Sequence, residues 1–246
     1  MKGAIHIGTS GWSYKHWKNI FYPEALITTD WLQFYAQTFN ITELNTSFYH
    51  LPKLETTIGW GKKVPQGFMF CPKMSRYLTH MKKLNDPEES FEKFFDVFTP
   101  LKKKLGPVLI QLPPSLYFNI DKAEHVYKLC KTKYKYYRFA MEVRHQSWLE
   151  KESLDLMKQY NIAFVIAQSG TRFPYAEYVT AQHIYVRFHG PQQLYASSYT
   201  EEQLQNFANL FRQWQDEGHT VWAFFNNDVF GYAIENAKRL IEMCAV

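Results

Sequence analysis

The segment Phe139–Trp148 carries chemically active side chains directly after a short apolar run. The run ends at Glu142, and Arg144, His145 and Trp148 follow it. A carboxylate can accept a proton, a guanidinium can grip an anion, an imidazole can exchange protons near neutral pH, and an indole can stack on a base or sugar. A buried strand that becomes polar only at its C-terminal end is typical of the active face of a β/α barrel.

Polar and aromatic residues also follow seven further apolar runs of the chain. Because the C-terminal ends of all strands meet at one face of a barrel, we expect these residues to become neighbours there. The candidates for catalysis are His189, Glu142, His145 and Glu43. The candidates for ligand binding are Trp12, Tyr14, Asn45, Lys73, Arg76, Gln111, Arg144, Trp148, Arg187, Asn226 and Asn227.

Cations outnumber carboxylates in this set, with four fixed cations against Glu43 and Glu142. A cleft with that balance attracts anions, and arginine forks match the geometry of phosphate or carboxylate. The aromatic rings could stack on a base or sugar. His189 precedes the flexible Gly190, which favours it as the residue that moves protons.

A structural interpretation of the same residues stays open. Arg144 and Arg187 would then neutralise Glu43 and Glu142 inside the barrel mouth, because buried charges must be paired. His145 would be a hydrogen-bonded structural histidine.

Two other kinds of site are weaker alternatives. Glu43, Glu142, His145 and His189 could hold a divalent metal, but no two of them have a diagnostic spacing, so no cofactor is predicted. Glu43 and Glu142 could serve as a glycosidase pair, although neighbouring arginines would depress the pKa of a general acid. The common hydrolase, P-loop and dinucleotide motifs are absent from the sequence.

Eight short β-branched or aromatic runs predict strands, several of them apolar at consecutive positions as in parallel sheets covered on both faces. They are Ala4–Gly8, Ile41–Asn45, Phe68–Lys73, Pro107–Leu112, Arg138–Val143, Ala163–Ala167, His183–His189 and Thr220–Asn226.

Amphipathic helical patterns alternate with these runs. Asp86 and Thr200 are predicted N-caps, and only a weak helix is expected over Thr171–Ala181. Shorter patterns cover Trp31–Phe39 and Leu54–Lys62, among others. Eight alternating units in 246 residues, close to the roughly 250 of a complete barrel, predict an α/β fold: a single (β/α)₈ TIM-type barrel domain over residues 1–246 with parallel strands.

The composition of the chain indicates its cellular compartment and excludes some classes of protein. The formal net charge is +5, and three widely separated cysteines argue against a disulfide framework or zinc finger. There is no secretory signal and no apolar run long enough for a membrane helix, so a cytoplasmic protein without membrane contact is expected. The sequence predicts no oligomeric state.

The chain resembles a known family, the domain of unknown function 72 or YecE-like proteins. The resemblance rests on seven ordered motifs: Gly8-Thr-Ser-Gly-Trp-Ser-Tyr14, Glu43-Leu-Asn45, Lys73 with Thr79-His80, Gly106-Pro-Val-Leu-Ile-Gln-Leu-Pro-Pro114, Glu142-Val-Arg-His145, Val186-Arg-Phe-His-Gly190 and Phe225-Asn-Asn227. It implies a TIM-type barrel and no assigned activity. Relatives usually carry an Asp where this chain has Gln168.

The leading hypothesis is a barrel whose cationic, aromatic mouth binds a phosphorylated or nucleic-acid-like ligand, with or without hydrolysing it. One alternative is a non-catalytic protein that binds a ligand or a partner at the same residues. The other is a carboxylate-dependent glycoside hydrolase.

Overall fold

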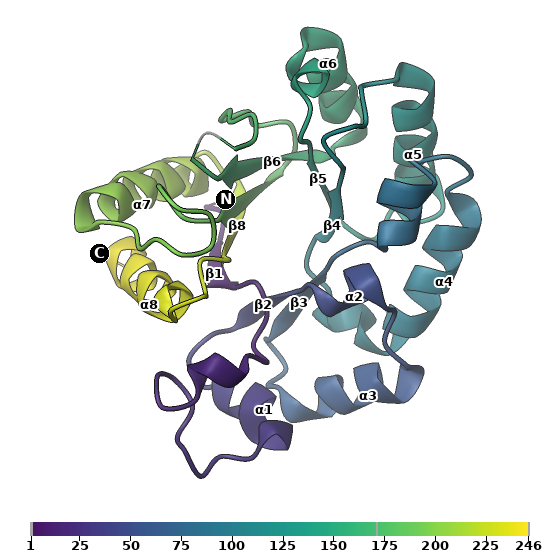
Figure 1. The fold of residues 1–246 in the computed structure, drawn as a ribbon. Helices are drawn as coiled ribbons and strands as arrows, with labels where there is room; N and C mark the ends of the chain where they lie inside the picture. Colours follow the sequence, from purple (N-terminus) through teal and green to yellow (C-terminus); the bar gives the residue numbers. More distant parts are fainter. Residues whose placement is uncertain (1, 171, 246) are drawn as a thin grey trace.

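Residues 2–170 and 172–245 are described by the computed structural model, and eight parallel strands form within them. The strands are β1 (Ile5–Thr9), β2 (Ile41–Leu44), β3 (Met69–Pro72), β4 (Val108–Gln111), β5 (Phe139–Glu142), β6 (Ala163–Gln168), β7 (His183–Phe188) and β8 (Thr220–Phe225). All eight predicted strands are confirmed to within about two residues. In Figure 1 they form the inner ring of the molecule, with helices outside it.

The strands close into a barrel in the order β3-β2-β1-β8-β7-β6-β5-β4. The first and last strands pair in register from Ile5 opposite Val221 to Thr9 opposite Phe225. Between β3 and β4 the ladder is reduced to isolated backbone bonds, including Met74 N to Leu109 O at 2.8 Å. The predicted TIM-type barrel is therefore confirmed, with a narrow seam beside Lys73.

Helices connect the strands and cover the outside of the barrel. The α-helices are α1 (Trp31–Tyr35), α2 (Thr46–Tyr49), α3 (Leu54–Lys63), α4 (Glu88–Phe98), α5 (Ile120–Thr132), α6 (Lys151–Tyr160), α7 (Glu201–Asp216) and α8 (Tyr232–Cys244). Short 3₁₀ turns cover Lys15–Trp17, Thr28–Asp30, Thr99–Lys104 and Gln146–Leu149, and a π-helical turn covers Tyr77–Met81. The stripes of aromatic residues on α4 and α7 pack into the layer between helices and sheet, as their spacing predicts.

The helix termini agree with the sequence in part. Thr200 caps α7 through a complete capping box with Gln203, as predicted. The expected cap at Asp86 is wrong, because this residue has a positive φ of 40° and α4 begins after Pro87. The helix expected over Thr171–Ala181 is also not formed, since residues 172–181 are loop; Thr171 itself lies outside the described residues.

The barrel interior is filled in layers, because alternate residues of a strand point inward. Its buried apolar layer includes one residue from each of six strands: Ile41, Cys71, Leu109, Ala140, Tyr185 and Phe224. Two residues further along these strands come Glu43, Lys73, Gln111, Glu142, Arg187 and Asn226. We call these six residues the polar layer; it lies at the C-terminal ends of the strands.

Candidate functional site

Arg187 is the centre of the polar layer. Its Nη2 lies 2.7 Å from Glu43 Oε1, and its Nη1 lies 2.5 Å from Glu142 Oε2. The arginine is 1% exposed, and both glutamates are fully buried. One guanidinium therefore holds two carboxylates from opposite parts of the barrel, which agrees with the structural interpretation that buried charges are paired.

Tyr185 adds a second donor to Glu43, because its hydroxyl lies 2.8 Å from Glu43 Oε2. Burial is the first reason why its pKa is raised, and the nearby Glu43 carboxylate is the second, so the phenol keeps its proton. Sequence reasoning did not select Tyr185. Its position two residues before Arg187 on the same strand was the available signal, because strand residues at this spacing share a face.

Arg144 extends the network toward the edge of the barrel. Its Nε and Nη2 donate to Glu142 Oε1 at 3.0 and 2.9 Å, and Nη2 also donates to Gln111 Oε1 at 3.0 Å. Burial by itself would raise the pKa of Glu142, but Arg187 and Arg144 outweigh that effect and hold the pKa well below its usual range. Glu142 is therefore ionised throughout the physiological pH range.

Lys73 is the cation whose charge the network does not balance. Its Nζ donates to the neutral Gln111 Oε1 at 2.7 Å and lies 4.0 Å from the centre of the Phe48 ring. Among the described residues, no carboxylate oxygen lies within 4.0 Å of this nitrogen. Burial, followed by the charge of Arg187, lowers the pKa of Lys73 to about 7. The amine can therefore gain or lose a proton near neutrality.

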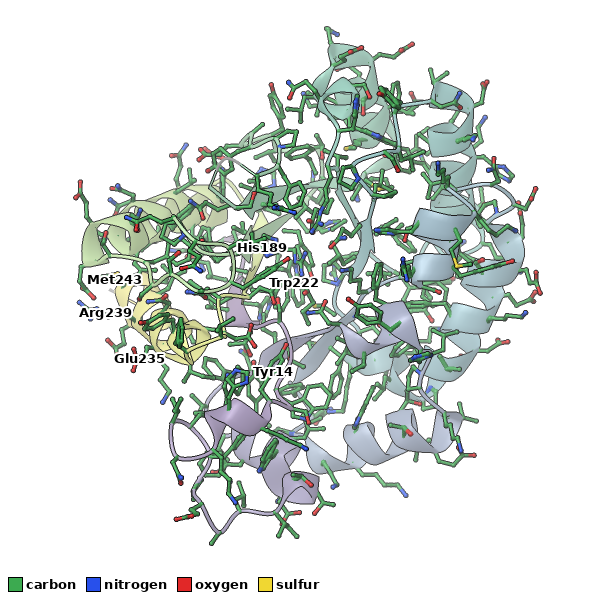
Figure 2. The ribbon with its side chains drawn as sticks, viewed as in Figure 1. Tyr14, His189, Trp222, Glu235, Arg239 and Met243 are labelled. Carbon is green, nitrogen blue, oxygen red and sulfur yellow. The ribbon has the colours of Figure 1, made fainter. Side chains whose placement is uncertain are left out.

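His189 lies above the polar layer and is completely buried. Asn226 Nδ2 lies 3.0 Å from His189 Nδ1, which leaves the ring proton on Nε2, 4.0 Å from Glu142 Oε1. Burial and the neighbouring Arg187 lower the pKa of His189 well below its usual value, so the ring stays neutral. Figure 2 labels His189 on the β7–β8 side of the barrel; Trp222, also labelled there, pairs with Tyr185 four residues earlier along the strand direction and therefore lies deeper in the barrel. This neutral ring is suited to donate a hydrogen bond from Nε2.

Several predicted residues lie away from this network. Trp148 is 1% exposed and donates from Nε1 to Leu116 O, so its expected stacking on a ligand has no open ring face to support it. His145 accepts from Ser147 N and caps the turn at Gln146–Leu149. Asn227 donates to Ser197 O and Asn236 Oδ1 inside the protein.

Arg76 is also separate from the polar layer, because its exposed side chain precedes the π-helical turn. Of the four expected cations, Lys73, Arg144 and Arg187 therefore come together around Gln111.

Trp12 and Tyr14 line a cavity of about 480 Å³ beside the polar layer. Trp60 of α3 forms an edge contact with Trp12 at a ring-centre distance of 5.4 Å, and Glu43 and Asn45 line the inner part. We call these five residues the tryptophan pocket. Figure 2 labels Tyr14 in the loop after β1, below the barrel opening in this view. Trp60 was not selected from the sequence, because aromatic residues at helical spacing usually belong to the core.

The arrangement also bears on the two weaker alternatives. Within residues 2–170 and 172–245, no three His, Cys, Asp or Glu side chains gather as a metal site requires. Glu43 and Glu142 share the guanidinium of Arg187, and the pKa of Glu142 is depressed. A glycosidase general acid needs a raised pKa, so this geometry argues against a glycosidase pair.

Residues 6–246 match the model of a family described as protein of unknown function DUF72. The chain belongs to this family. It is 27% identical to the UPF0759 protein YunF of Bacillus subtilis, over 97% of this chain and 94% of YunF. It is 28% identical to the UPF0759 protein YecE of Escherichia coli K12, over 60% of this chain and 51% of YecE.

Crystal structures of DUF72 proteins have the same fold. A DUF72 protein from Thermotoga maritima superposes with a TM-score of 0.87 at 30% identity, covering 99% of this chain and all of that one. A second, from Enterococcus faecalis, has a TM-score of 0.84 at 22% identity, covering 98% of this chain and 96% of that one. The resemblance inferred from the seven motifs is thus confirmed.

Gln168 occupies the position where DUF72 sequences were expected to carry an Asp. Its Oε1 accepts a hydrogen bond from Tyr199 Oη at 2.5 Å, so the amide is held toward α7.

No helix in the described part of the chain is both long and apolar enough to cross a lipid bilayer.

Proposed function

We propose that the chain binds a small phosphorylated ligand that carries a planar ring, of which a nucleotide is the type, at the C-terminal end of the barrel. The observation that carries this proposal is the unbalanced Lys73. Arg144 and Arg187 face Glu43 and Glu142, two charges against two, and Lys73 adds a cation with only an amide oxygen as its polar partner. A buried cation of this kind is stabilised when an anion joins it.

The tryptophan pocket supports the ring part of the ligand. Its volume of about 480 Å³ falls within the range of small-molecule sites, roughly 300–1,000 Å³. Two indoles and a phenol offer flat apolar surfaces for a base or sugar. Asn45 offers a buried Oδ1 that has no hydrogen-bond partner in the described part of the chain. Glu43 lines this pocket and also contacts Arg187, so the pocket adjoins the polar layer.

Hydrolysis of the bound phosphate ester is the finer part of the proposal. Water would attack phosphorus as the ester P–O bond breaks, the Lys73 ammonium would give a proton to the departing oxygen, and the neutral amine so formed would take the proton released by the water, which restores the ammonium. Lys73, with a pKa of about 7, is better suited to this proton exchange than His189, whose pKa is lowered so far that the ring stays neutral. A binding protein without turnover remains the second candidate, because the same cation and rings hold a ligand without any chemistry.

The test is titration calorimetry with the four common nucleoside monophosphates and their nucleosides, at fixed salt, on the wild type and Lys73→Met. Lys102→Met is the matched control, because Lys102 is exposed on the outside of the barrel. We expect at least one monophosphate to bind, and Lys73→Met to weaken it tenfold or more while the nucleoside affinity changes less than twofold. Equal monophosphate affinity in the wild type and Lys73→Met would overturn the proposal, and so would binding of none of the four.

Phosphate release from the bound monophosphate then separates the two candidates. Release that is lost in Lys73→Met supports hydrolysis. Tight binding with no release supports the binding protein.

A further inference from the structure

A second hollow, of about 490 Å³, opens on the other side of the polar layer from the tryptophan pocket. It lies where β6 ends and the loop after β7 passes. Arg144, Ser169, Arg172, Phe173 and Gln192 line it, and we call these residues the arginine pocket. Arg144 belongs both to this pocket and to the network around Glu142, so the hollow adjoins the polar layer.

Phe173 holds two guanidinium groups close to one aromatic ring. The Cζ of Arg144 lies 4.1 Å from the ring centre and the Cζ of Arg172 lies 5.8 Å from it. Such stacking orients a guanidinium and leaves the nitrogens at its edge available for hydrogen bonds. Two positive charges on one ring repel each other, and an anion between them would remove that repulsion.

The hydrogen-bonding capacity of both arginines is incompletely used. Arg144 donates from Nε and Nη2 to Glu142 and Gln111. No partner of its Nη1 is found within residues 2–170 and 172–245. In the same described ranges, the side chain of Arg172 has neither an ion pair nor a hydrogen bond, and its surface is exposed to solvent. None of the described residues that line the pocket has a carboxylate side chain.

Ser169 supplies an independent observation that points to a ligand. It is 5% exposed, and its Oγ is one of the buried polar atoms without a hydrogen-bond partner in the described chain. Leaving a buried hydroxyl unpaired costs about 1–3 kcal/mol. Ser169 follows the interior residue Ala167 by two positions, the same spacing that produces the polar layer. Ser169 lines the pocket, and its buried hydroxyl is a donor or acceptor without a partner in the described part of the chain.

We propose that the arginine pocket is a second anion subsite, which binds a phosphate group through Arg144, Arg172 and the Ser169 hydroxyl. This inference rests on the proposed function in one respect: the group bound here is the terminal phosphate of the same ligand, so that a nucleoside diphosphate fits better than a monophosphate. Donors from two guanidiniums and one hydroxyl approach from different directions, which suits the several oxygens of phosphate better than the two of a carboxylate.

The binding test compares nucleoside mono- and diphosphates on the wild type, Arg172→Ala, Ser169→Ala and Lys73→Met. Arg138→Ala is the control, because Arg138 is an exposed arginine that precedes β5 at the opposite end of the barrel. We expect the wild type and the control to prefer the diphosphate at least tenfold. Arg172→Ala should lose that preference and keep the monophosphate affinity within twofold, and Ser169→Ala should reduce the preference about threefold. A preference that persists in Arg172→Ala overturns the subsite.

A chemical protection test judges the subsite even if no nucleotide binds. Phenylglyoxal modifies exposed arginines, and its reaction at Arg172 can be followed by peptide mass. We expect 20 mM inorganic phosphate, chosen as roughly saturating for a weak anion site, to slow modification of Arg172 at least threefold in the wild type and equally in Lys73→Met. In Ser169→Ala, phosphate should slow the modification of Arg172 less than it does in the wild type. No protection in the wild type overturns the proposal, and equal protection by acetate overturns its assignment to phosphate.

Discussion

Arg187 and Glu43 are joined by a 2.7 Å contact across the interior of the barrel, although 144 positions separate them in the sequence. The contact connects β7 to β2, and the other terminal nitrogen of Arg187 reaches Glu142 of β5. Three strands that are not neighbours in the sheet are thereby linked above its apolar interior. The polar layer is thus a structural element of the barrel as well as a candidate binding surface.

Replacing Arg187 with Met should strongly destabilise the fold. The substitution leaves two buried carboxylates without their shared cation, and breaking a buried ion pair in this way costs about 3–5 kcal/mol. Urea unfolding followed by circular dichroism measures the difference. The triple variant Arg187→Met, Glu43→Gln, Glu142→Gln is the control, because it removes the charges together and should recover part of the loss. A single variant within 1 kcal/mol of the wild type would contradict this account.

Lys73 should give the protein a stability that rises with pH above neutrality. Burial lowers its folded-state pKa from 10.5 to about 7, so the unfolded chain binds more protons between these values and unfolding is favoured at the lower end of that window. The advantage of Lys73→Met over the wild type should therefore be greatest below pH 7. It should shrink by about 1 kcal/mol per pH unit from pH 7 toward pH 10. Urea midpoints at pH 7, 8 and 9 measure it, and a constant difference would show that Lys73 does not titrate in this window.

His183 should make the fold sensitive to mild acid. Its burial lowers the pKa to about 4, and its Nε2 lies 3.0 Å from the carbonyl oxygen of Phe139. The unfolded chain takes up a proton at this residue near pH 6.5 and the folded chain only near pH 4, so stability falls as pH drops through that interval. His183→Gln, which keeps a donor for Phe139 O, should lessen the loss between pH 7 and 5 by on the order of 1–2 kcal/mol. An unchanged acid dependence in this variant would mean that another group causes the loss.

Trp148 and Trp12 should respond oppositely to substitution. Trp148→Phe removes the donor to Leu116 O and part of a buried packing contact, which should cost about 1–3 kcal/mol of stability. Nucleotide affinity should stay within twofold of the wild type. Trp12→Ala should weaken nucleotide binding with a smaller loss of stability, because Trp12 is half-buried at the tryptophan pocket. Calorimetry measures nucleotide affinity and urea unfolding measures stability in both variants. Weaker nucleotide binding in Trp148→Phe alone would contradict the assignment of Trp12 to the ligand and of Trp148 to the core.

The strands were predictable because their signal is local. A run such as Val108-Leu-Ile is apolar at consecutive positions, and this alone indicates a strand covered on both faces. Termini were less predictable, since Asp86 has the composition of a cap but adopts a positive φ that places it outside α4. The rule that the C-terminal ends of all barrel strands meet at one face also predicted correctly that Glu43 and Arg187 would be neighbours there.

The electrostatic roles within the site could not be read from the sequence. Lys73 was expected to be an ordinary cation, and its depressed pKa depends on burial and on Arg187, which comes from a strand more than 100 residues later. His189 was expected to move protons, but the same surroundings keep it neutral. Trp148 follows Glu142 by six residues, yet its ring turns into the core because the chain after β5 folds into a 3₁₀ turn.

The pairing of β1 with β8 has a consequence for how the chain is made. The partner of Ile5 is Val221, which leaves the ribosome about 10–45 s later at roughly 5–20 residues per second. During that interval one edge of β1 lacks its native neighbour, and Glu43 has no Arg187 until β7 emerges. Early strands with unpaired edges are prone to association. The newly made chain therefore depends on late synthesis to bury its first strand, and truncation before β8 should yield an aggregating fragment and not a smaller barrel.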